Sequence, residues 1–418
     1  MPLRSVILAS MLLAISCASC ASPQPEPQAP PPKQDRPALP PARLSAPASV
    51  TAGQTEFGVE LYRRLAAEPG NLFLSPASVS MALGMVYAGA EGETAAEMAQ
   101  ALRYPAAGAN EGMADLLRRL PIAAEGRRLD IANALWVQQT FPLKPAYLDQ
   151  VRRHYGGGAQ AVDFTGAPDR AIATVNRWAE EKTAGRIKSI LRPENINDRT
   201  RLVLTNAVYF KADWLHPFQA AQTRPRPFKL GGGTTVSVPM MRQRGHFRLL
   251  ENPSFEAVEM PYKGEELSML LFVPKESVGL KAFERQLEGK ALSGWIDRLM
   301  ASERHDLSLV VPKLELDTRA SLVPQLQALG IRRAFTQMAQ LGGMADARLY
   351  LSDVLHQTYL RVDEKGTEAA AVTAGLAEIV SMPRLFEVDR PFFFVIRDNR
   401  SGTLLFLGRI ERPIAPNA

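Results

Sequence analysis

The order of helix-like and strand-like segments constrains the fold of this chain more than any other feature of its sequence. Six strand-like runs lie after residue 200, at 202–210, 267–274, 307–311, 349–362, 391–396 and 403–410, whereas helical patterns dominate the first half. The two types do not alternate as they do in folds built around a parallel sheet. No second linker or internal repeat interrupts the chain after residue 49. We therefore expect one large α+β domain at 49–415, with mainly antiparallel sheets.

The stretch NLFLSPASVSMALGMVYAGAEGET (71–94) indicates where the first clear helix of this domain begins. Ser75 suits the N-cap, and Pro76 suits the first helical position because its missing N–H needs no partner there. Apolar residues follow at helical spacing, and Gly89 is a suitable end.

The first 48 residues are expected to form an export signal and a linker. Arg4 precedes an apolar run at 6–15 that is too short to span a bilayer, which is typical of a secretory signal at 1–20. The chain's two cysteines, Cys17 and Cys20, end this run as in bacterial lipoprotein signals, although neither has the preferred leucine three residues earlier. We expect a secreted protein held at the cell envelope by a lipid on Cys17 or Cys20. A signal that is simply cleaved is the alternative.

Proline dominates the linker at 21–48, with ten prolines between residues 23 and 47. Such a composition cannot bury a core and favours an extended tether, at about 3.1 Å per residue. The domain that follows has no cysteine, so it has neither a disulfide nor a thiol nucleophile.

Motifs for catalysis and metal binding are missing from the sequence. It has no G-x-S-x-G, H-E-x-x-H or GxxxxGK[ST] motif, and its five histidines do not fall at metal-ligand spacing. We expect no enzymatic activity, no metal and no cofactor. A hydrolase with a hidden Ser–His pair is an alternative that no motif supports.

Positive charge is spread along the chain, although the net charge is +6. The densest basic pairs are Arg118-Arg119, Arg127-Arg128 and Arg152-Arg153, which we interpret as solvated helix faces. We therefore expect no nucleic-acid partner. The first two pairs are the only candidates for a polyanion site.

Seven stretches, in order, resemble the serpin family of serine protease inhibitors over essentially all of 50–415. They are residues 71–94, TNAVYFKADWLHPF (205–218), VPMMRQ (238–243), VPKLELDT (311–318), LGIRRAF (329–335), VLHQTYLRVDEKGTEAAA (354–371) and LFEVDRPFFFVIRDNRSGTLLFLGRI (385–410). The resemblance implies the serpin fold, with three sheets and an exposed reactive-centre loop. It also implies that a protease cleaves this loop, whose N-terminal part then inserts as an extra strand in the main sheet.

The stretch DEKGTEAAAVTAGLAEIV (363–380) has the side chains that such an insertion needs. Thr367 and every second residue after it, through 373, are small and uncharged, while the charge of Glu368 falls on the opposite face. Gly366 allows the backbone to rotate. The expected hinge comprises Glu364, Lys365, Gly366, Thr367, Glu368, Ala369, Ala370 and Ala371. A flexible solvated loop, or a non-inhibitory serpin that acts as a binding or structural module, is the alternative.

The family's pattern implies that the reactive bond joins Val380 to Ser381. Val380 lies fourteen positions after Gly366, and the count back from the C-terminal stretch agrees. A small branched side chain suits the shallow apolar pocket of elastase-like proteases. Met382 and Arg384 are the runners-up.

Other family positions carry over one residue at a time. The shutter, a polar cluster beneath the opening sheet, comprises Ser75, Ser78, Asn206 and His356. The breach, where the loop first enters, comprises Trp214 and an ion pair between Lys313 and Glu364. The resemblance implies a monomer that traps a serine protease as a covalent acyl complex and contacts a membrane only through its lipid anchor.

Overall fold

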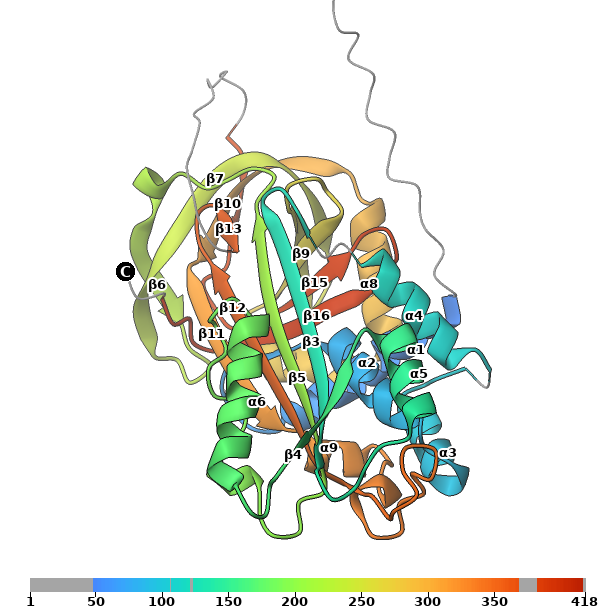
Figure 1. Cartoon of the computed structure of the whole chain (residues 1–418). Coiled ribbons are helices and arrows are strands. Elements are labelled where there is room, and N and C mark those ends of the chain that lie inside the picture. The colour runs from blue at the N-terminus through green and yellow to red at the C-terminus, as the bar shows by residue number, and fades with distance from the viewer. Residues whose placement is uncertain (1–47, 106, 121–122, 368–381, 416–418) are drawn as a thin grey trace, which may run out of the picture. The chain divides into compact units, whose positions relative to one another are not determined.

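The computed structural model describes residues 48–105, 107–120, 123–367 and 382–415, which belong to one compact unit at 41–418 (Figure 1). The α-helices in this part of the chain are α1 (Ala48–Leu65), α2 (Pro76–Tyr87), α3 (Gly92–Ala101), α4 (Ala109–Arg119), α5 (Pro145–Tyr155), α6 (Pro168–Lys182), α7 (Gly279–Arg285), α8 (Gly289–Ala301) and α9 (Val323–Ala328). Three short 3₁₀ turns are η1 (Pro193–Asn195), η2 (Ala220–Gln222) and η3 (Arg333–Phe335).

One sheet has seven strands and contains the longest central strands in Figure 1. Its order is β11 (Leu314–Ser321), β12 (Leu351–Val362), β5 (Leu202–Asp213), β3 (Arg127–Gln138) and β2 (Ala123–Ala124), with β4 (Gly158–Val162) on β3 and β13 (Gly366–Thr367) on β5. The β5–β12 and β3–β4 pairs are parallel, and the others are antiparallel.

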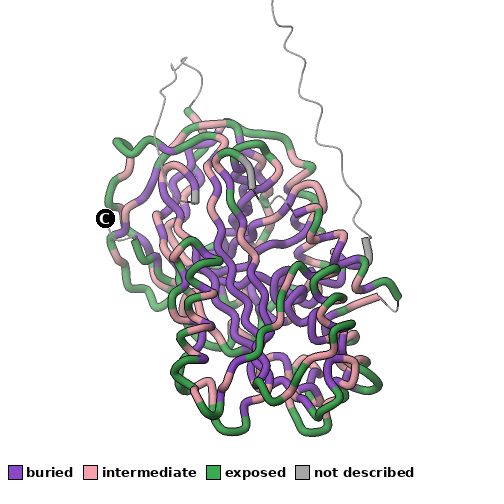
Figure 2. The backbone as a smooth tube through the Cα atoms, in the orientation of Figure 1, coloured by how far each residue is buried: buried purple, intermediate pink, exposed green. Residues whose placement is uncertain are grey.

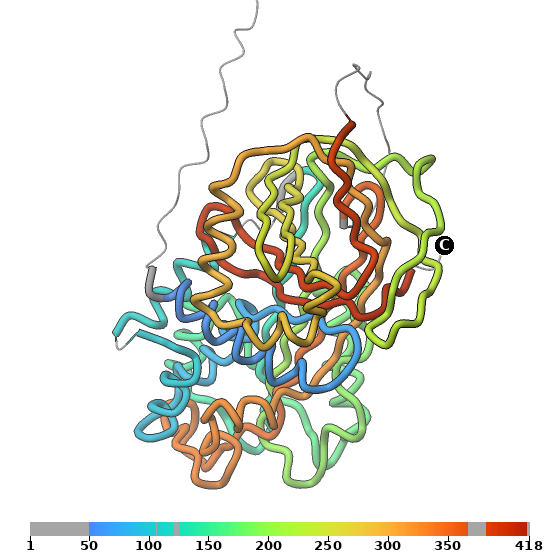
Figure 3. The backbone as a smooth tube through the Cα atoms, turned by 180° about the vertical axis from the view of Figure 1, so that it is seen from behind, coloured from blue at the N-terminus to red at the C-terminus, as the bar shows by residue number. Residues whose placement is uncertain are grey.

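A second network has nine strands, which Figure 3 brings to the front together with α1. Its order is β1 (Leu72–Leu74), β16 (Leu404–Ile410), β15 (Phe392–Asp398), β9 (Leu267–Pro274), β8 (Phe255–Pro261), β7 (Thr235–Glu251), β10 (Arg304–Pro312) and β14 (Arg384–Glu387), with β6 (Arg224–Lys229) on β7. The last three residues of β7 pair with β8, and its earlier residues pair with β6 and β10. Because β7 is shared in this way, the three expected sheets form two hydrogen-bonded networks.

Two apolar clusters cover the two faces of the seven-stranded sheet. The larger packs one face against α2, α1 and the nine-stranded network, and the smaller packs the other face against α6. Trp136 and Trp178 meet edge to face in the smaller cluster, with ring centroids 5.6 Å apart. Figure 2 shows the buried residues following the long central strands.

The α+β class, the predominance of antiparallel pairing and all six expected strands are confirmed, with ends that shift by up to three residues. The helix α2 also begins as expected, because the Ser75 side chain accepts a hydrogen bond from the Ser78 N–H and Pro76 takes the first helical position. The expectation that Arg127-Arg128 lies on a helix face is wrong, since these residues begin β3. Arg127 is buried there, and an ion pair with Glu266, far away in the sequence, compensates its charge.

None of the helices among the described residues is both long enough and apolar enough to cross a membrane.

Candidate functional site

The candidate site lies along the seam between β5 and β12, the two parallel central strands of the seven-stranded sheet. They pair from Leu202 and Leu351 to Tyr209 and Tyr359, and beyond this point they diverge. The short strand β13 then runs antiparallel to the end of β5. A strand that continued from β13 down the seam would be antiparallel to both of its neighbours, which is the pairing of most strands in this sheet.

Gly366 brings the start of the hinge against the backbone of β5. Its φ is +152°, and a Cβ added to it would lie 2.1 Å from the carbonyl oxygen of Ala212. A side chain would therefore be strained by the backbone and blocked by the neighbouring strand. Main-chain bonds hold the same turn, since the Trp214 N–H donates to the Lys365 carbonyl at 2.6 Å and the Asp363 N–H donates to the Gly366 carbonyl at 2.8 Å.

The expected breach ion pair is present. Lys313 Nζ lies 2.9 Å from Oε2 and 3.2 Å from Oε1 of Glu364, which also accepts a hydrogen bond from Thr223 Oγ1 at 2.7 Å. Burial alone would raise the pKa of the Glu364 carboxyl, but the hydrogen bonds from Thr223 and Lys313 outweigh burial and hold the pKa below its usual value. Glu364 is thus a carboxylate held on one side by Lys313, which lies between β10 and β11, and on the other by Thr223, which lies between β5 and β6.

Trp214 lies at the expected breach, directly after β5. Its indole Nε1 donates to the carbonyl of Asp363 at 3.1 Å, and its ring stacks on Tyr262 with centroids 4.5 Å apart and planes at 8°. The side chain is buried. It therefore links the end of β12, through Asp363, to the nine-stranded network.

The four shutter residues lie together beneath the seam. His356 of β12 stands directly opposite Asn206 of β5, and its Nδ1 is 2.5 Å from the Asn206 Oδ1. The His356 Nε2 accepts a hydrogen bond from the Ser75 N–H at 3.1 Å, so the ring proton is on Nδ1. The Asn206 amide donates to the Ser78 hydroxyl. Burial lowers the pKa of His356 to about 3, which hydrogen bonding to Asn206 offsets only in part.

Asn133 is a member of this network that the sequence analysis missed. It lies opposite Asn206 on β3, and its Oδ1 accepts a hydrogen bond from the Asn206 amide. No motif surrounds Asn133, so only the register of β3 on β5 identifies it. The network thus joins three adjacent strands to the start of α2.

Met382 and Arg384, the alternative positions for the reactive bond, differ in how their side chains are held. Met382 is 96% exposed. Arg384 begins β14 and forms ion pairs with Glu251 and Glu256. A side chain held by two carboxylates is poorly placed to enter the specificity pocket of a protease.

Several expected site residues lie outside the described part of the chain. They are the reactive bond (Val380 and Ser381), the hinge residues Glu368, Ala369, Ala370 and Ala371, and the lipidation candidates Cys17 and Cys20. Of Thr367, the structure describes only the backbone, which pairs with Ala212. In the described ranges, no three His, Cys, Asp or Glu side chains gather as metal ligands would.

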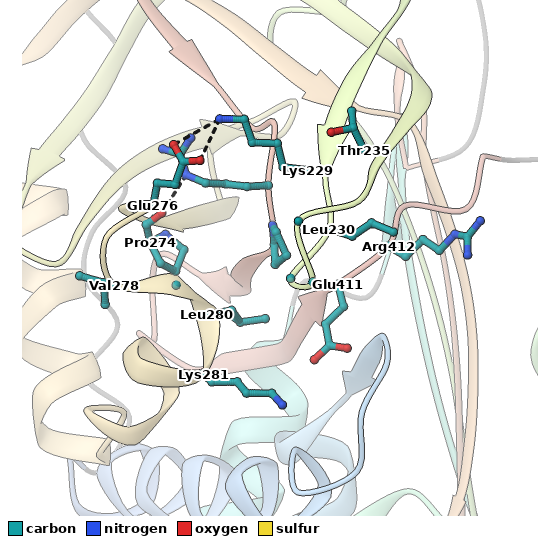
Figure 4. Close-up of a pocket in the computed structure, with 16 residues that line it drawn as sticks. Lys229, Leu230, Thr235, Pro274, Glu276, Val278, Leu280, Lys281, Glu411 and Arg412 are labelled. Atoms are coloured by element: carbon teal, nitrogen blue, oxygen red, sulfur yellow. Dashed lines mark hydrogen bonds and ion pairs between the residues drawn. The ribbon is translucent and has the colours of Figure 1, made fainter.

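A separate pocket of about 950 Å³ contains none of the expected site residues (Figure 4). Leu280 lies among its apolar lining residues, and Lys229 forms an ion pair with Glu276 at 3.0 Å on its rim. Three more cations line it: Arg390, which is paired with Asp389, and Lys281 and Arg412, whose side chains have no acidic partner among the described residues. The carboxylate of Glu411 also lines the pocket and is paired with Arg409. The pocket could therefore hold an anionic molecule with an apolar body.

Comparisons with known proteins agree with this arrangement. The family model for serpins (serine protease inhibitors) matches residues 52–413. An uncharacterised serpin-like protein of Thermococcus kodakarensis is 40% identical, covering 85% of this chain and 84% of that protein. The leukocyte elastase inhibitor of Bos taurus is 35% identical, covering 87% and 99%. The structure of human thyroxine-binding globulin complexed with thyroxine superposes with a TM-score of 0.80 at 28% identity, covering 87% of this chain and 98% of that chain. This chain belongs to the serpin family.

Proposed function

We propose that this chain inhibits serine proteases by trapping them as covalent complexes. The geometry of the seam carries the proposal. β5 and β12 are parallel neighbours, and β13 has already begun an antiparallel strand at the end of β5. Chain released by cleavage after Val380 could extend β13 between them and gain backbone hydrogen bonds on both sides.

The chemistry of the trap comes from the protease. Its serine attacks the carbonyl carbon of Val380, the peptide bond to Ser381 breaks, and the new amino group of Ser381 leaves with the C-terminal segment. The ester on Val380 is then carried along as the segment after Thr367 enters the seam. This chain supplies no catalytic group and needs no cofactor.

The proposed targets are elastase-like enzymes. A valine at the reactive bond fits a shallow apolar pocket and not a pocket with a buried acid. The name of the bovine relative, leukocyte elastase inhibitor, supports the same class. The charged runner-up Arg384 is engaged by Glu251 and Glu256, which also favours Val380.

The test is a panel of serine proteases, read on denaturing gels for a complex that survives boiling. We expect a covalent complex with at least one elastase-like enzyme. Thr367 already pairs with β5 in the uncleaved chain, so the test uses Ala369, the next residue on the same face. Ala369→Arg would bring a permanent charge into the seam during insertion, at a cost of several kcal/mol, while leaving the reactive bond unchanged. Since a 10-fold change in partition needs only about 1.4 kcal/mol, this variant should be cleaved at the same bond and release active protease. If the Ala369→Arg chain traps as well as the native chain, the segment after Thr367 does not insert.

A non-inhibitory binding role is the second candidate, and the pocket in Figure 4 is the observation that favours it. Thyroxine-binding globulin, which has the same fold, forms a complex with thyroxine. Cleavage within 368–381 distinguishes the two functions. A trapping protein should gain a large increase in its unfolding temperature when nicked, because the sheet gains a strand. A binding module should show no increase.

We further propose that the chain is a monomer, exported and held at the cell envelope by a lipid on Cys17 or Cys20. The apolar run at 6–15 and the proline-rich linker at 21–48 support this location.

A further inference from the structure

The seam between β5 and β12 ends at one cross-strand pair, Tyr209 and Tyr359. Both rings lie on the sheet face that packs against α6. Tyr209 and Tyr359 are almost fully buried, with exposed fractions of 4% and 6%. Their centroids are 6.4 Å apart, with planes inclined at 37°. This is the last pair in register before the two strands diverge toward the breach.

Two arginines cover these rings. The Cζ of Arg186, in the segment after α6, lies 5.4 Å from the centroid of Tyr359, and its side chain also hydrogen-bonds to Tyr209. One guanidinium therefore contacts both sides of the seam. The Cζ of Arg128, on β3, lies 5.9 Å from the centroid of Tyr209. Both arginines are exposed at their outer ends, and Arg128 also forms an ion pair with Asp130 at 2.6 Å, so each cation–π contact contributes about 0.5–1 kcal/mol.

Neighbouring elements hold these side chains in position. The Arg186 N–H donates to the carbonyl of Thr183, and the Ile187 N–H donates to the Thr183 hydroxyl, both at 3.0 Å, so the arginine is fixed to the end of α6. The Tyr359 hydroxyl donates to Oε1 of Glu315 on β11 at 2.8 Å. Separating the tyrosines thus disturbs contacts on both flanks of the seam.

The register of β13 shows when an entering strand would meet this group. Thr367 pairs with Ala212, and each later residue of an antiparallel strand moves one position back along β5. Ala370 would therefore stand opposite Tyr209, where Tyr359 now stands. The tyrosine pair is the first contact in register that insertion must break.

We propose that Tyr209, Tyr359, Arg128 and Arg186 form a latch that limits how fast the chain after Thr367 enters the seam. The proposal rests on the trapping function proposed above. It concerns the opening of the seam between β5 and β12, which depends on contacts within this chain. A tight latch keeps the uncleaved sheet closed. It also sets the time in which the acyl-enzyme can hydrolyse before it is carried into the sheet.

Uptake of a synthetic peptide with the sequence of residues 367–380 measures this step without a protease. The full-length uncleaved chain is incubated with the peptide, and the rate is followed by the gain in resistance to thermal unfolding. Arg186→Met keeps the aliphatic stem and removes the guanidinium, so uptake should become about 2- to 5-fold faster. Arg177→Met changes an exposed arginine of α6 and serves as the matched control, with the native rate expected.

A second, milder variant tests the same contact independently, in case Arg186→Met misfolds. Tyr209→Phe keeps the ring and removes only the hydroxyl, so its uptake should be faster than that of the native chain and slower than that of Arg186→Met. The latch is wrong if both variants take up peptide at the rate of Arg177→Met, or if none of the chains takes up peptide. A chain that forms no covalent protease complex but shows the expected order of uptake rates would refute trapping and leave the latch intact.

Discussion

Acidification should destabilise the uncleaved protein through a single buried histidine, His356. The folded chain keeps this ring neutral, because burial lowers its pKa to about 3. Protonation would also remove the lone pair with which Nε2 accepts the Ser75 N–H. The unfolded chain has no such restriction, and its histidine takes up a proton near pH 6.5.

The sign and size of the effect follow from these two pKa values. Above about pH 6.5 the His356 ring is neutral in both the folded and the unfolded chain, so the protein keeps its full free energy of unfolding. As the pH falls from about 6.5 toward 3, the unfolded chain binds the extra proton, and the free energy of unfolding drops by about 1.4 kcal/mol per pH unit. Between pH 7.5 and pH 5, His356 should therefore remove about 2 kcal/mol of stability.

Urea unfolding of the uncleaved chain at pH 7.5 and pH 5, followed by tryptophan fluorescence, measures this loss. His356→Gln cannot titrate in this range, so the stability difference between native chain and variant should shrink by about 2 kcal/mol at the lower pH. His216→Gln, which changes an exposed histidine, is the matched control and should keep the native pH dependence. A difference between the native chain and His356→Gln that is the same at both pH values would refute the assignment of a neutral, buried ring.

Three further predictions concern the hinge, the reactive bond and the anchor. Gly366→Ala should lower the free energy of unfolding of the uncleaved chain by about 1–3 kcal/mol, because its Cβ would meet the Ala212 carbonyl oxygen, and an unchanged denaturation midpoint would contradict this close approach. Val380→Arg should redirect inhibition from elastase-like to trypsin-like enzymes. N-terminal sequencing of the released peptide should begin at Ser381, and any other start would move the reactive bond. Replacing both Cys17 and Cys20 with serine should release the protein from membranes, whereas native protein found wholly unmodified in the soluble fraction would count against a lipid anchor.

Local chemistry made parts of the fold predictable from the sequence. The start of α2 depends on Ser75 and Pro76 themselves, and the strand at 267–274 is apolar except for Ser268, in keeping with the burial of every one of its residues. β7 was missed because exposed arginines alternate along its outer face and Gly245 interrupts any apolar pattern. Arg127 was misinterpreted because its partner, Glu266, lies on a distant segment.

Some residues of the candidate site could likewise be predicted from the sequence, and others could not. Family resemblance indicated the shutter, and the structure brings its four residues together with Asn133, whose only signal is its position opposite Asn206. Tyr209 and Tyr359 lie within recognisable motifs, yet nothing near them in the sequence points to Arg128 or Arg186. Those contacts depend on how α6 packs on the sheet and on the register of β3 beside β5, which no short stretch of the chain encodes.

The position of β16 constrains how this protein can be made. This last strand, Leu404–Ile410, lies between β1 and β15, and its Phe406 stacks on Phe73 with centroids 4.8 Å apart. A chain that leaves the ribosome or an export channel N-terminus first cannot close this sheet until nearly all of it has emerged. Until then β1 and β15 present unpaired edges, which readily pair with other chains. Copies that stop short of Leu404 should therefore aggregate, and a chaperone that covers these edges during translocation would raise the yield of folded protein.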